Sequence, residues 1–151
     1  LKDTTKVSVF DDVYRNAYGT EHFLSVEDEA RTTVLAFLRL RLPDGDSLDK
    51  DEKTQRMRKE VSAAFPELTN AAFIRELHTY GQALKVKDSR ESAVQHQGWG
   101  KVLMKEAERI AKEKGYTGLA VISGIGVRQY YRKQGFRLRG TYMVKTFKKK
   151  V

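Results

Sequence analysis

The segment Gln95-His96-Gln97-Gly98-Trp99-Gly100 leads into the clearest helix of the sequence, predicted over residues 98–113. Leu103, Ala107 and Ile110 recur there at the spacing that places apolar side chains on one helix face. Two glycines let a ligand approach the backbone closely, and the N–H groups of a first helical turn are free and carry partial positive charge. The segment has the properties of a pyrophosphate-binding turn, although a glycine-rich turn without a ligand looks the same. It is neither a Walker loop, since Gly-Lys-Ser/Thr is absent, nor a dinucleotide-binding fingerprint, since the G-x-G-x-x-G spacing is absent.

A second pattern follows downstream, where the apolar run 119–123 predicts a strand buried on both faces. After it, residues 126–134 predict a second helix that ends at Gly135, and Tyr131 stands four residues before that glycine. A Q-x-x-G-x-G turn before one helix, together with a tyrosine before Gly-Phe in the next, resembles the joint pattern of the GNAT acetyltransferases. Either half alone is a weak signal, and the combination in this order is much more specific.

The remaining segments predict strands around one charged insert. We expect an amphipathic helix at 9–18, strands at 22–28, 32–42 and 71–80, a short strand or hairpin at 81–87, and a final strand, or a hairpin around Gly140, at 136–147. Residues 44–70 are dominated by charged side chains and predict an inserted, solvent-facing helix or a flexible loop. This order indicates an α/β protein with the GNAT fold: a mixed, twisted sheet of about six strands with helices on both faces, in a single domain over residues 1–151.

Composition excludes several classes of site and points to an anionic partner. The chain has no cysteine, which excludes a disulfide framework, a thiolate zinc site and a cysteine-ligated iron–sulfur cluster, and we expect no metal. Its formal net charge is +9, and residues 114–151 hold 10 of the 29 lysines and arginines and none of the 20 acidic residues. This one-sided excess predicts a polyanionic partner, such as nucleic acid or a phosphate-rich ligand. With no apolar run long enough for a membrane span and no signal peptide, a cytoplasmic protein is expected.

The resemblance extends from the GNAT pattern to one family, the acetyltransferase domain of the Elongator catalytic subunit. The matching segments are residues 23–25 (FLS), 38–41 (LRLR), 75–81 (RELHTYG), 95–100 (QHQGWG), 106–111 (EAERIA), 120–124 (AVISG), 130–133 (YYRK) and 142–145 (YMVK). Trp99 stands where the family more often has phenylalanine, Phe136 where tyrosine is common, and Lys85 where a proline is expected. The family also carries a radical-SAM half with a cysteine-ligated cluster. We therefore expect either an excised or stand-alone acetyltransferase half, or a radical-SAM protein acting in trans.

The resemblance implies acetyl-CoA as the cofactor. Its pyrophosphate is expected on Gln95, Gln97, Gly98, Trp99, Gly100 and Lys101, and its pantetheine arm along Glu76, Leu77, His78 and Thr79. A strand N–H near His78 would polarise the thioester carbonyl, and Tyr131 would hydrogen-bond the sulfur and protonate the leaving thiolate. Tyr130 is a second candidate, but it lies about 100° around the helix and cannot share that position. Each tyrosine also fits core packing or a surface contact.

Glu76 and His78 are candidate bases, because alternation along the strand puts both on one face and Leu77 on the other. The alternatives are an ion pair for Glu76 and a satisfied, partly buried histidine for His78. His96 is as well suited to fixing the loop as to acting as a base, and His22 is interpreted as structural. Trp99 either covers the nucleotide or forms a wall of the pocket, or it is a core anchor.

The family's acceptor is the wobble uridine of tRNA. The basic C-terminal segment is therefore expected to contact the anticodon region through Arg128, Arg132, Lys133, Arg137, Arg139 and Lys145. Alone, the domain would bind acetyl-CoA and cleave its thioester, with hydrolysis stimulated by tRNA. Three alternatives stay open: lysine (protein) N-acetyl transfer, a generic GNAT enzyme acting on a small amine, and a catalytically silent acetyl-CoA or tRNA-binding module.

Overall fold

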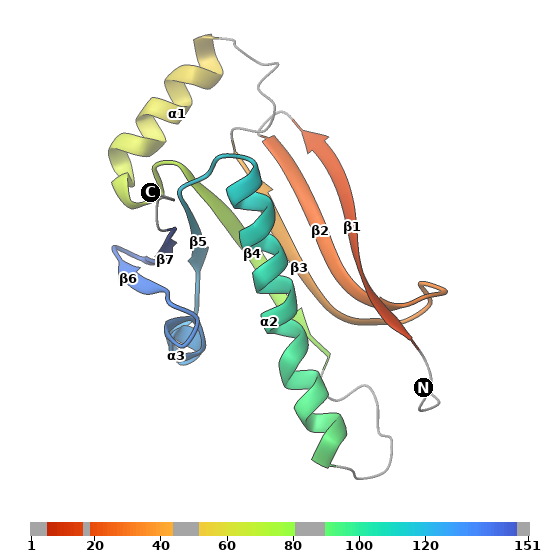
Figure 1. Cartoon of the computed structure of the whole chain (residues 1–151). Coiled ribbons are helices and arrows are strands. Elements are labelled where there is room, and N and C mark those ends of the chain that lie inside the picture. Colours follow the sequence, from red (N-terminus) through yellow and green to blue (C-terminus); the bar gives the residue numbers. More distant parts are fainter. Residues whose placement is uncertain (1–5, 17–18, 44–51, 81–89, 148–151) are drawn as a thin grey trace.

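The computed structural model describes residues 6–16, 19–43, 52–80 and 90–147, and these form a seven-stranded sheet with the order β1-β2-β3-β4-β5-β7-β6 (Figure 1). In chain order the elements are β1 (Val7–Asn16), β2 (Gly19–Asp28), β3 (Val34–Leu42), α1 (Glu52–Ala64), the 3₁₀ turn η1 (Pro66–Leu68), β4 (Ala71–Thr79), α2 (Arg90–Glu113), β5 (Gly118–Ile122), the 3₁₀ turn η2 (Ile125–Val127), α3 (Arg128–Arg132), β6 (Arg137–Arg139) and β7 (Tyr142–Thr146). Neighbouring strands are antiparallel except β4 and β5, which run parallel. No helix in these ranges is long and apolar enough to cross a membrane.

The helix expected at 9–18 is wrong, because this segment forms β1. It pairs residue by residue with β2, from Val7 opposite Asp28 to Asn16 opposite Gly19. A helix of about ten residues is marginal unless its apolar face is packed. Pairing along the edge of β2 satisfies the backbone instead, and β-branched Val9 and Val13 suit a strand.

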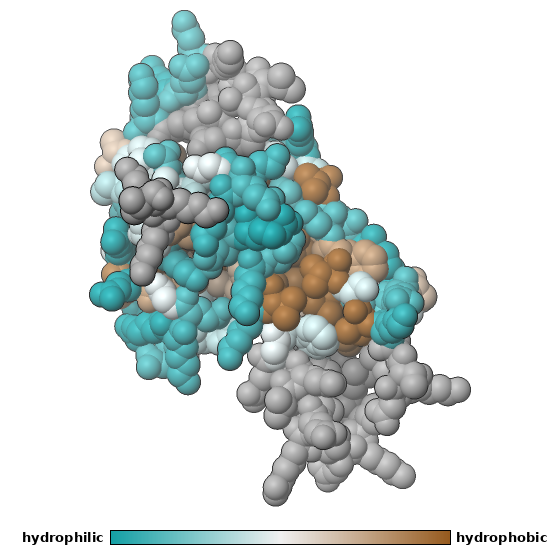
Figure 2. Space-filling view, viewed as in Figure 1, coloured by the Kyte–Doolittle hydropathy of each residue, from teal (hydrophilic) through white to brown (hydrophobic). Residues whose placement is uncertain are grey.

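The main core lies between α2 and the face of the sheet that this helix crosses in Figure 1. Leu103 and Ala107 of α2 are fully buried, as their helical spacing predicts. They belong to one cluster with Leu38 and Leu40 of β3 and Ile74 of β4. Beyond α2 the sheet continues into β1 and β2, and Figure 2 shows hydrophobic surface on this side of them. The core therefore holds β3 and β4 firmly, and the site described below is built on β4.

The mixed sheet with helices confirms the expected fold, with seven strands where about six were expected, and the cover on the two faces is unequal. On the face away from α2, a smaller cluster joins the 3₁₀ turn after α1 to β4, β5 and β7, and consists of Leu68, Ala71, Ala120 and Val144. The charged insert contains a helix, α1, that ends before Pro66, while residues 44–51 lie outside the described part of the chain. The hairpin expected around Gly140 is present as β6 and β7, with Gly140 at a φ of 56°. The short strand or hairpin expected at 81–87 lies outside the described residues.

Candidate active site

The two parallel strands separate halfway along β4. Their pairing runs from Ala71 opposite Gly118 to Ile74 opposite Val121 and then stops. The next residue, Arg75, is an extra residue in the β3–β4 register, and such a bulge bends a strand and increases its twist. Within the described residues, the rest of β4 pairs only with β3. Its other edge offers backbone N–H and C=O groups that an extended ligand can pair with, in the manner of an added strand.

A buried carboxylate holds the bulge in place. Glu21 of β2 is 1% exposed, and its Oε1 accepts hydrogen bonds from Arg41 Nε at 2.6 Å and from Arg75 Nη1 at 2.7 Å. Taking a carboxylate out of water is costly unless it is paired, and here two guanidinium groups pair with it. The pairing ties β2, β3 and β4 together at the point where β4 leaves β5.

Tyr130 of α3 reaches the junction between α2 and the end of β4. A Cβ atom added to Gly100 would lie 2.7 Å from the Tyr130 hydroxyl and 3.6 Å from Thr79 Cγ2. The three residues therefore meet beside the free edge of β4. Burial raises the pKa of Tyr130, and the nearby Gln134 amide opposes that shift only in part. The phenol is neutral at pH 7 and can donate a proton.

Tyr131, the predicted proton donor, is placed deeper in the protein. It is 7% exposed and belongs to the main core cluster. Its ring packs edge-on against Phe136, with centroids 5.6 Å apart, and against Tyr130, with centroids 5.3 Å apart. Burial, with a smaller contribution from Tyr130, raises the pKa of Tyr131 as well. The expectation that the two tyrosines occupy different positions holds, and it is the Tyr130 hydroxyl that lies against Gly100.

Glu76 and His78 share one face of β4, as alternation predicts, and Leu77 packs against the main core on the other. Glu76 Oε2 lies 3.7 Å from Arg39 Nη1, so the ion pair considered for this residue is formed. The ring of His78 is exposed and stacks against Phe37, with centroids 5.7 Å apart. His78 is thus not the buried histidine of the alternative interpretation. Both side chains lie on the sheet face away from α2.

The glycine segment differs from the prediction in its backbone. Helix α2 begins at Arg90, eight residues before the predicted start at Gly98, so residues 95–100 lie within the helix. Their N–H groups are past the first turn, where they bond to carbonyls of the preceding turn, and the predicted row of free N–H groups is absent from this structure. Residues 90–97 contain neither glycine nor proline, which explains why the helix extends through them. The side chains of Gln95, His96 and Gln97 lie outside the described set.

The two glycines and Trp99 have different surroundings within α2. A Cβ at Gly98 would meet no atom within 4 Å, so the helix surface is open there, whereas Gly100 is buried against Tyr130. Trp99, between them, is partly buried and packs against the main core. This placement agrees with the interpretation of Trp99 as a core anchor.

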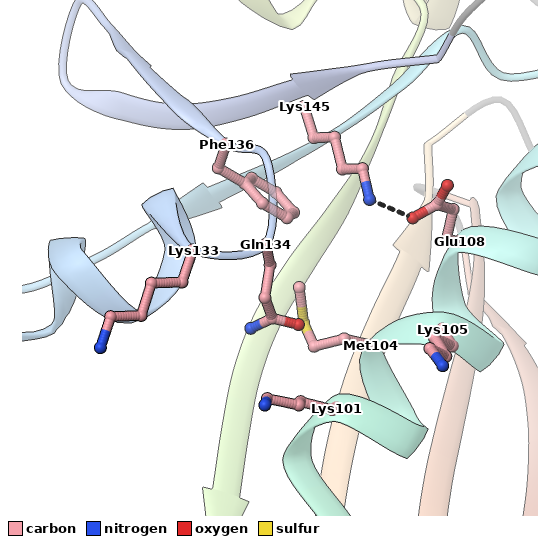
Figure 3. Close-up of a pocket in the computed structure, with 8 residues that line it drawn as sticks. All are labelled: Lys101, Met104, Lys105, Glu108, Lys133, Gln134, Phe136 and Lys145. Atoms are coloured by element: carbon pink, nitrogen blue, oxygen red, sulfur yellow. Dashed lines mark hydrogen bonds and ion pairs between the residues drawn. The ribbon is translucent and has the colours of Figure 1, made fainter. Parts of the chain in front are cut away.

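A pocket of about 270 Å³ lies between α2, the segment that follows α3, and β7 (Figure 3). It is lined by Lys101, Met104, Lys105, Glu108, Lys133, Gln134, Phe136 and Lys145. Lys145 Nζ donates to Glu108 Oε2 at 2.5 Å. Burial raises the pKa of Glu108, but hydrogen bonds from Lys112 and Lys145 outweigh it and lower the pKa overall. Lys105 and Gln134 belong to no motif in the sequence, although Lys105 stands one helical turn after Lys101 and so shares its face.

Comparisons with known proteins bear on the family and the fold of the chain. No protein-family model matches the chain. Elongator complex protein 3 of Bos taurus is 44% identical over 129 residues, which are 85% of this chain and 21% of that protein. A tRNA uridine(34) acetyltransferase of Methanocaldococcus infernus is 40% identical over 147 residues, 96% of this chain and 24% of that protein. The solved structure of the Elp3 protein of the same archaeon, with an N-terminal deletion, superposes with a TM-score of 0.63 at 35% identity, over 93% of this chain and 30% of that one.

The chain is a homologue of the acetyltransferase part of the Elongator complex protein 3 family. It spans about a fifth to a quarter of the length of these curated relatives. Distant structures show the shared GNAT fold: Tetrahymena GCN5, with a TM-score of 0.53 at 13% identity over 90% of this chain and 72% of that one, is similar. So is a streptothricin acetyltransferase of Bacillus anthracis, with a TM-score of 0.53 at 13% identity over 97% of this chain and 88% of that one, whose structure is a complex with acetyl coenzyme A.

In this Elongator homologue the six predicted nucleic-acid residues occupy one continuous segment but not one face. Arg137 and Arg139 of β6 are exposed and, by their pairing with β7, point to the sheet face away from α2. Lys145 points to the α2 face, where it pairs with Glu108, and Lys133 lines the pocket beside it. The remaining two belong to α3: Arg132 is exposed, and Arg128 is half-buried, with an Nε that has no hydrogen-bond partner among the described residues. The structure therefore divides the predicted basic surface into two parts.

Proposed function

We propose that this domain binds acetyl-CoA along the free edge of β4, cleaves its thioester beside Tyr130, and supplies the acetyl group for modification of a tRNA wobble uridine at C5. One observation carries the proposal: β4 separates from β5 at a bulge, and the neutral phenol of Tyr130 lies near Thr79, at the end of the free strand edge. Relatives of this chain are named tRNA uridine(34) acetyltransferases, and a protein of the same fold has been solved with acetyl coenzyme A. Both facts support the same cofactor and acceptor here.

The residues around the separated strands fit such a ligand. Residues 76–79 of β4 provide a row of backbone donors and acceptors for an extended pantetheine arm, and a strand N–H near His78 can polarise a carbonyl. The open helix surface at Gly98 leaves room for a ligand at α2. When bound, acetyl-CoA supplies an acetyl group already activated as a thioester. The chain has then to orient it, stabilise negative charge on its carbonyl oxygen and protonate the leaving sulfur.

Tyr130 is the better placed of the two candidate acids. Its hydroxyl lies at the α2–β4 junction, and burial keeps its proton in place at pH 7. Tyr131 packs against the Tyr130 ring from the core side and helps to hold it. Glu76 and His78 lie on the far sheet face, so in this proposal they act through their backbone groups, and water is a sufficient acceptor for hydrolysis.

The tRNA part of the proposal places the acceptor on the basic segment that begins at the end of α3 and continues through β6. Arg132, Arg137 and Arg139 are exposed there and available to phosphates. Carbon chemistry at the wobble uridine needs a radical-SAM protein or domain as a further partner, because a chain without cysteine cannot ligate an iron–sulfur cluster through thiolates. In the domain alone, tRNA should stimulate thioester hydrolysis.

The test measures release of free CoA from acetyl-CoA with a thiol reagent, with and without tRNA. The absence of cysteine removes any background signal from the protein. Acetyl-CoA should raise the melting temperature, tRNA should accelerate thiol release, and Tyr130→Phe should retain binding while slowing release by about 10²–10⁴-fold. Tyr131→Phe is the matched control, with a smaller effect on release. A larger effect of Tyr131→Phe would return the acid role to Tyr131.

Two further outcomes bear on the alternatives. If saturating acetyl-CoA causes neither a thermal shift nor calorimetric heat, the cofactor assignment is wrong. Acetyl-CoA binding without thiol release, with or without tRNA, would identify a non-catalytic binding module. Gly98→Arg is the corresponding steric test. Because the position is open, the variant should fold, while its side chain should block a ligand that approaches α2 there.

A further inference from the structure

The two outer strands of the sheet differ in how well they are protected against pairing with another chain. An outer strand presents unpaired N–H and C=O groups, and proteins usually protect it by shortness, by lysine or proline, or by a covering element. One outer strand, β6, is three residues long and carries two arginines. The other, β1, is ten residues long and mostly exposed, contains neither lysine nor proline, and within the described residues pairs only with β2 (Figure 1). Its outer edge can therefore accept a further strand.

Exposed valines lie along this edge. Val9 stands opposite Val26 of the main core, so it lies on the α2 side of the sheet, and alternation puts Val13 on the same side. Val13 is 54% exposed, and Val9 is exposed as well. Figure 2 shows hydrophobic surface on this side of β1 and β2. A second apolar strand beside β1 would remove this surface from water.

The acidic side chains of β1 do not protect the edge, because each is paired within its own chain. Asp11 Oδ2 lies 2.9 Å from Nδ1 of the buried His22 in β2. Asp12 Oδ1 accepts a hydrogen bond from Arg31 Nη1 at 3.3 Å, in the turn that follows β2. A charge protects an edge when an incoming strand would bury it without a partner. Here an incoming strand meets carboxylates that already have partners.

A second copy of β1 is complementary to this edge in one register. We propose that two copies of this chain form a two-fold dimer by antiparallel pairing of β1 with β1, centred on Val13. Residues directly opposite each other lie on the same face of the sheet, and in this register Asp11 stands opposite Arg15 of the second copy and Asp12 opposite Tyr14. Among the charged residues of β1, only this register puts opposite charges directly opposite each other. Centring on Asp11 or on Asp12 would put two identical carboxylates together.

The dimer joins two seven-stranded sheets into one and leaves the candidate active sites open. Its axis is perpendicular to the sheet, so both copies of α2 lie on the same side. The free edge of β4 faces β5, away from β1, and stays accessible in each copy. Pairing involves residues 10–16 of each copy, and an interface made mainly by one pair of strands is smaller than the roughly 1,600 Å² of a stable complex. Monomer and dimer should therefore exchange in a concentration-dependent equilibrium.

Disulfide trapping tests both the dimer and its register, because the chain contains no cysteine. Directly opposite residues of an antiparallel pair have Cα atoms about 4.5–5.5 Å apart, within the roughly 4.4–6.8 Å that a disulfide spans. Val13→Cys should therefore form an intermolecular disulfide under mild oxidation, detected as a doubled mass. Val9→Cys is the matched control, an exposed valine on the same face whose two copies would lie about 27 Å apart. Its disulfide should form at least tenfold more slowly.

Sedimentation of the full chain at several concentrations measures the equilibrium itself. Val13→Lys changes an exposed side chain, so its melting curve should match that of the wild type, while two lysines meet at the dimer axis. The dissociation constant of the dimer should rise at least tenfold. An equal mixture of Val13→Lys and Val13→Asp should recover the dimer, because opposite charges then meet at the axis. Val61→Lys, at an exposed valine of α1, should change the dissociation constant by less than twofold.

Three results would overturn the inference. The first is a monomer at every concentration up to about 1 mM. The second is a dimer that Val13→Lys does not weaken, which would show that another surface joins the copies. The third is a disulfide that forms as fast at Val9→Cys as at Val13→Cys, which would show that β1 pairs in another register or with another strand.

Discussion

Gly98 and Gly100 provide a matched pair of substitutions that tests the α2–Tyr130 contact. Both glycines lie inside the same helix, and alanine in place of a helical glycine stabilises by about 0.5–1 kcal/mol when nothing obstructs the new methyl group. At Gly98 a Cβ meets no atom within 4 Å, so Gly98→Ala should gain that amount. For a chain of this length the melting temperature should rise by about 1–4 °C.

Gly100→Ala should behave in the opposite way. Its Cβ would lie 2.7 Å from the Tyr130 hydroxyl, whereas ordinary contact begins at about 3.5 Å, so the phenol has to move by nearly an ångström. Overpacking of this kind costs roughly 1–3 kcal/mol, which exceeds or cancels the gain in helix propensity. Tyr130→Phe removes the obstructing oxygen, and the remaining neighbours of the Cβ are then at least 3.6 Å away. The double variant Gly100→Ala/Tyr130→Phe should therefore recover stability.

Urea unfolding measures the coupling between the two substitutions directly. It is carried out on four proteins: the wild type, Gly100→Ala, Tyr130→Phe and the double variant. We expect a coupling free energy of about 1–3 kcal/mol between Gly100→Ala and Tyr130→Phe. The same displacement should slow thiol release by up to ~10²-fold, because a shift of about 1 Å in a catalytic group is sufficient for such a loss. If Gly100→Ala is as stable as Gly98→Ala and its effect adds to that of Tyr130→Phe, Tyr130 does not lie against Gly100 and the site has to be rebuilt.

Three other predictions follow from charged groups. Glu21→Ala should destabilise by about 3–5 kcal/mol in urea unfolding, because it leaves two arginines without their shared buried partner. Glu108 has a folded-state pKa below its ordinary value of 4.5, so its contribution to stability is present above pH 4.5 and is lost as the pH falls through the folded-state pKa. Melting curves at pH 7 and pH 3 should accordingly show a smaller acid destabilisation for Glu108→Gln than for the wild type. Arg137→Glu/Arg139→Glu should weaken tRNA binding and reduce its salt dependence in filter binding at several salt concentrations, and an unchanged affinity would exclude the β6 arginines from the tRNA surface.

The parts of the fold that the sequence predicted correctly are those with local signals. The apolar face of α2 depends on spacing within one helix, and β3 depends on a run of β-branched, aromatic and leucine side chains before a Pro-Asp-Gly turn. The helix predicted at 9–18 is wrong because valines at 9 and 13 fit one face of a helix as well as one face of a strand. Pairing with β2, which lies farther along the chain, determines that this segment is a strand. The predicted start of α2 is wrong for the opposite reason. Two glycines were interpreted as the beginning of the helix, whereas the helix runs through both.

The candidate site divides in the same way, into features with a local sequence signal and features that depend on contacts distant in the sequence. The residue types of the motif, including Tyr130 and Thr79, were predictable, and the structure places them together. The bulge at Arg75 and its buried partner Glu21 are separated by 54 residues in the sequence, and no local pattern links them. That long-range contact lies at the residue where β4 leaves β5 and the free strand edge of the site begins. A motif therefore led to the candidate reacting groups but not to the bulge at which the two strands separate.

The distribution of charge over the structure indicates how many anion-binding sites to expect, which composition alone does not. The net charge of +9 and the acid-free segment 114–151 predict an anionic partner but not how many anionic sites exist. In the structure, Lys145 is neutralised by Glu108 and faces α2, whereas Arg137 and Arg139 face away from α2. Two sites on opposite faces of one hairpin can bind two different anions, and substitutions on one face should leave the other unaffected. If acetyl-CoA binds along the free edge of β4 and the β6 arginines bind tRNA, as proposed above, the two ligands bind together and not in competition. Simultaneous binding is also required by the proposal that tRNA stimulates cleavage of the thioester.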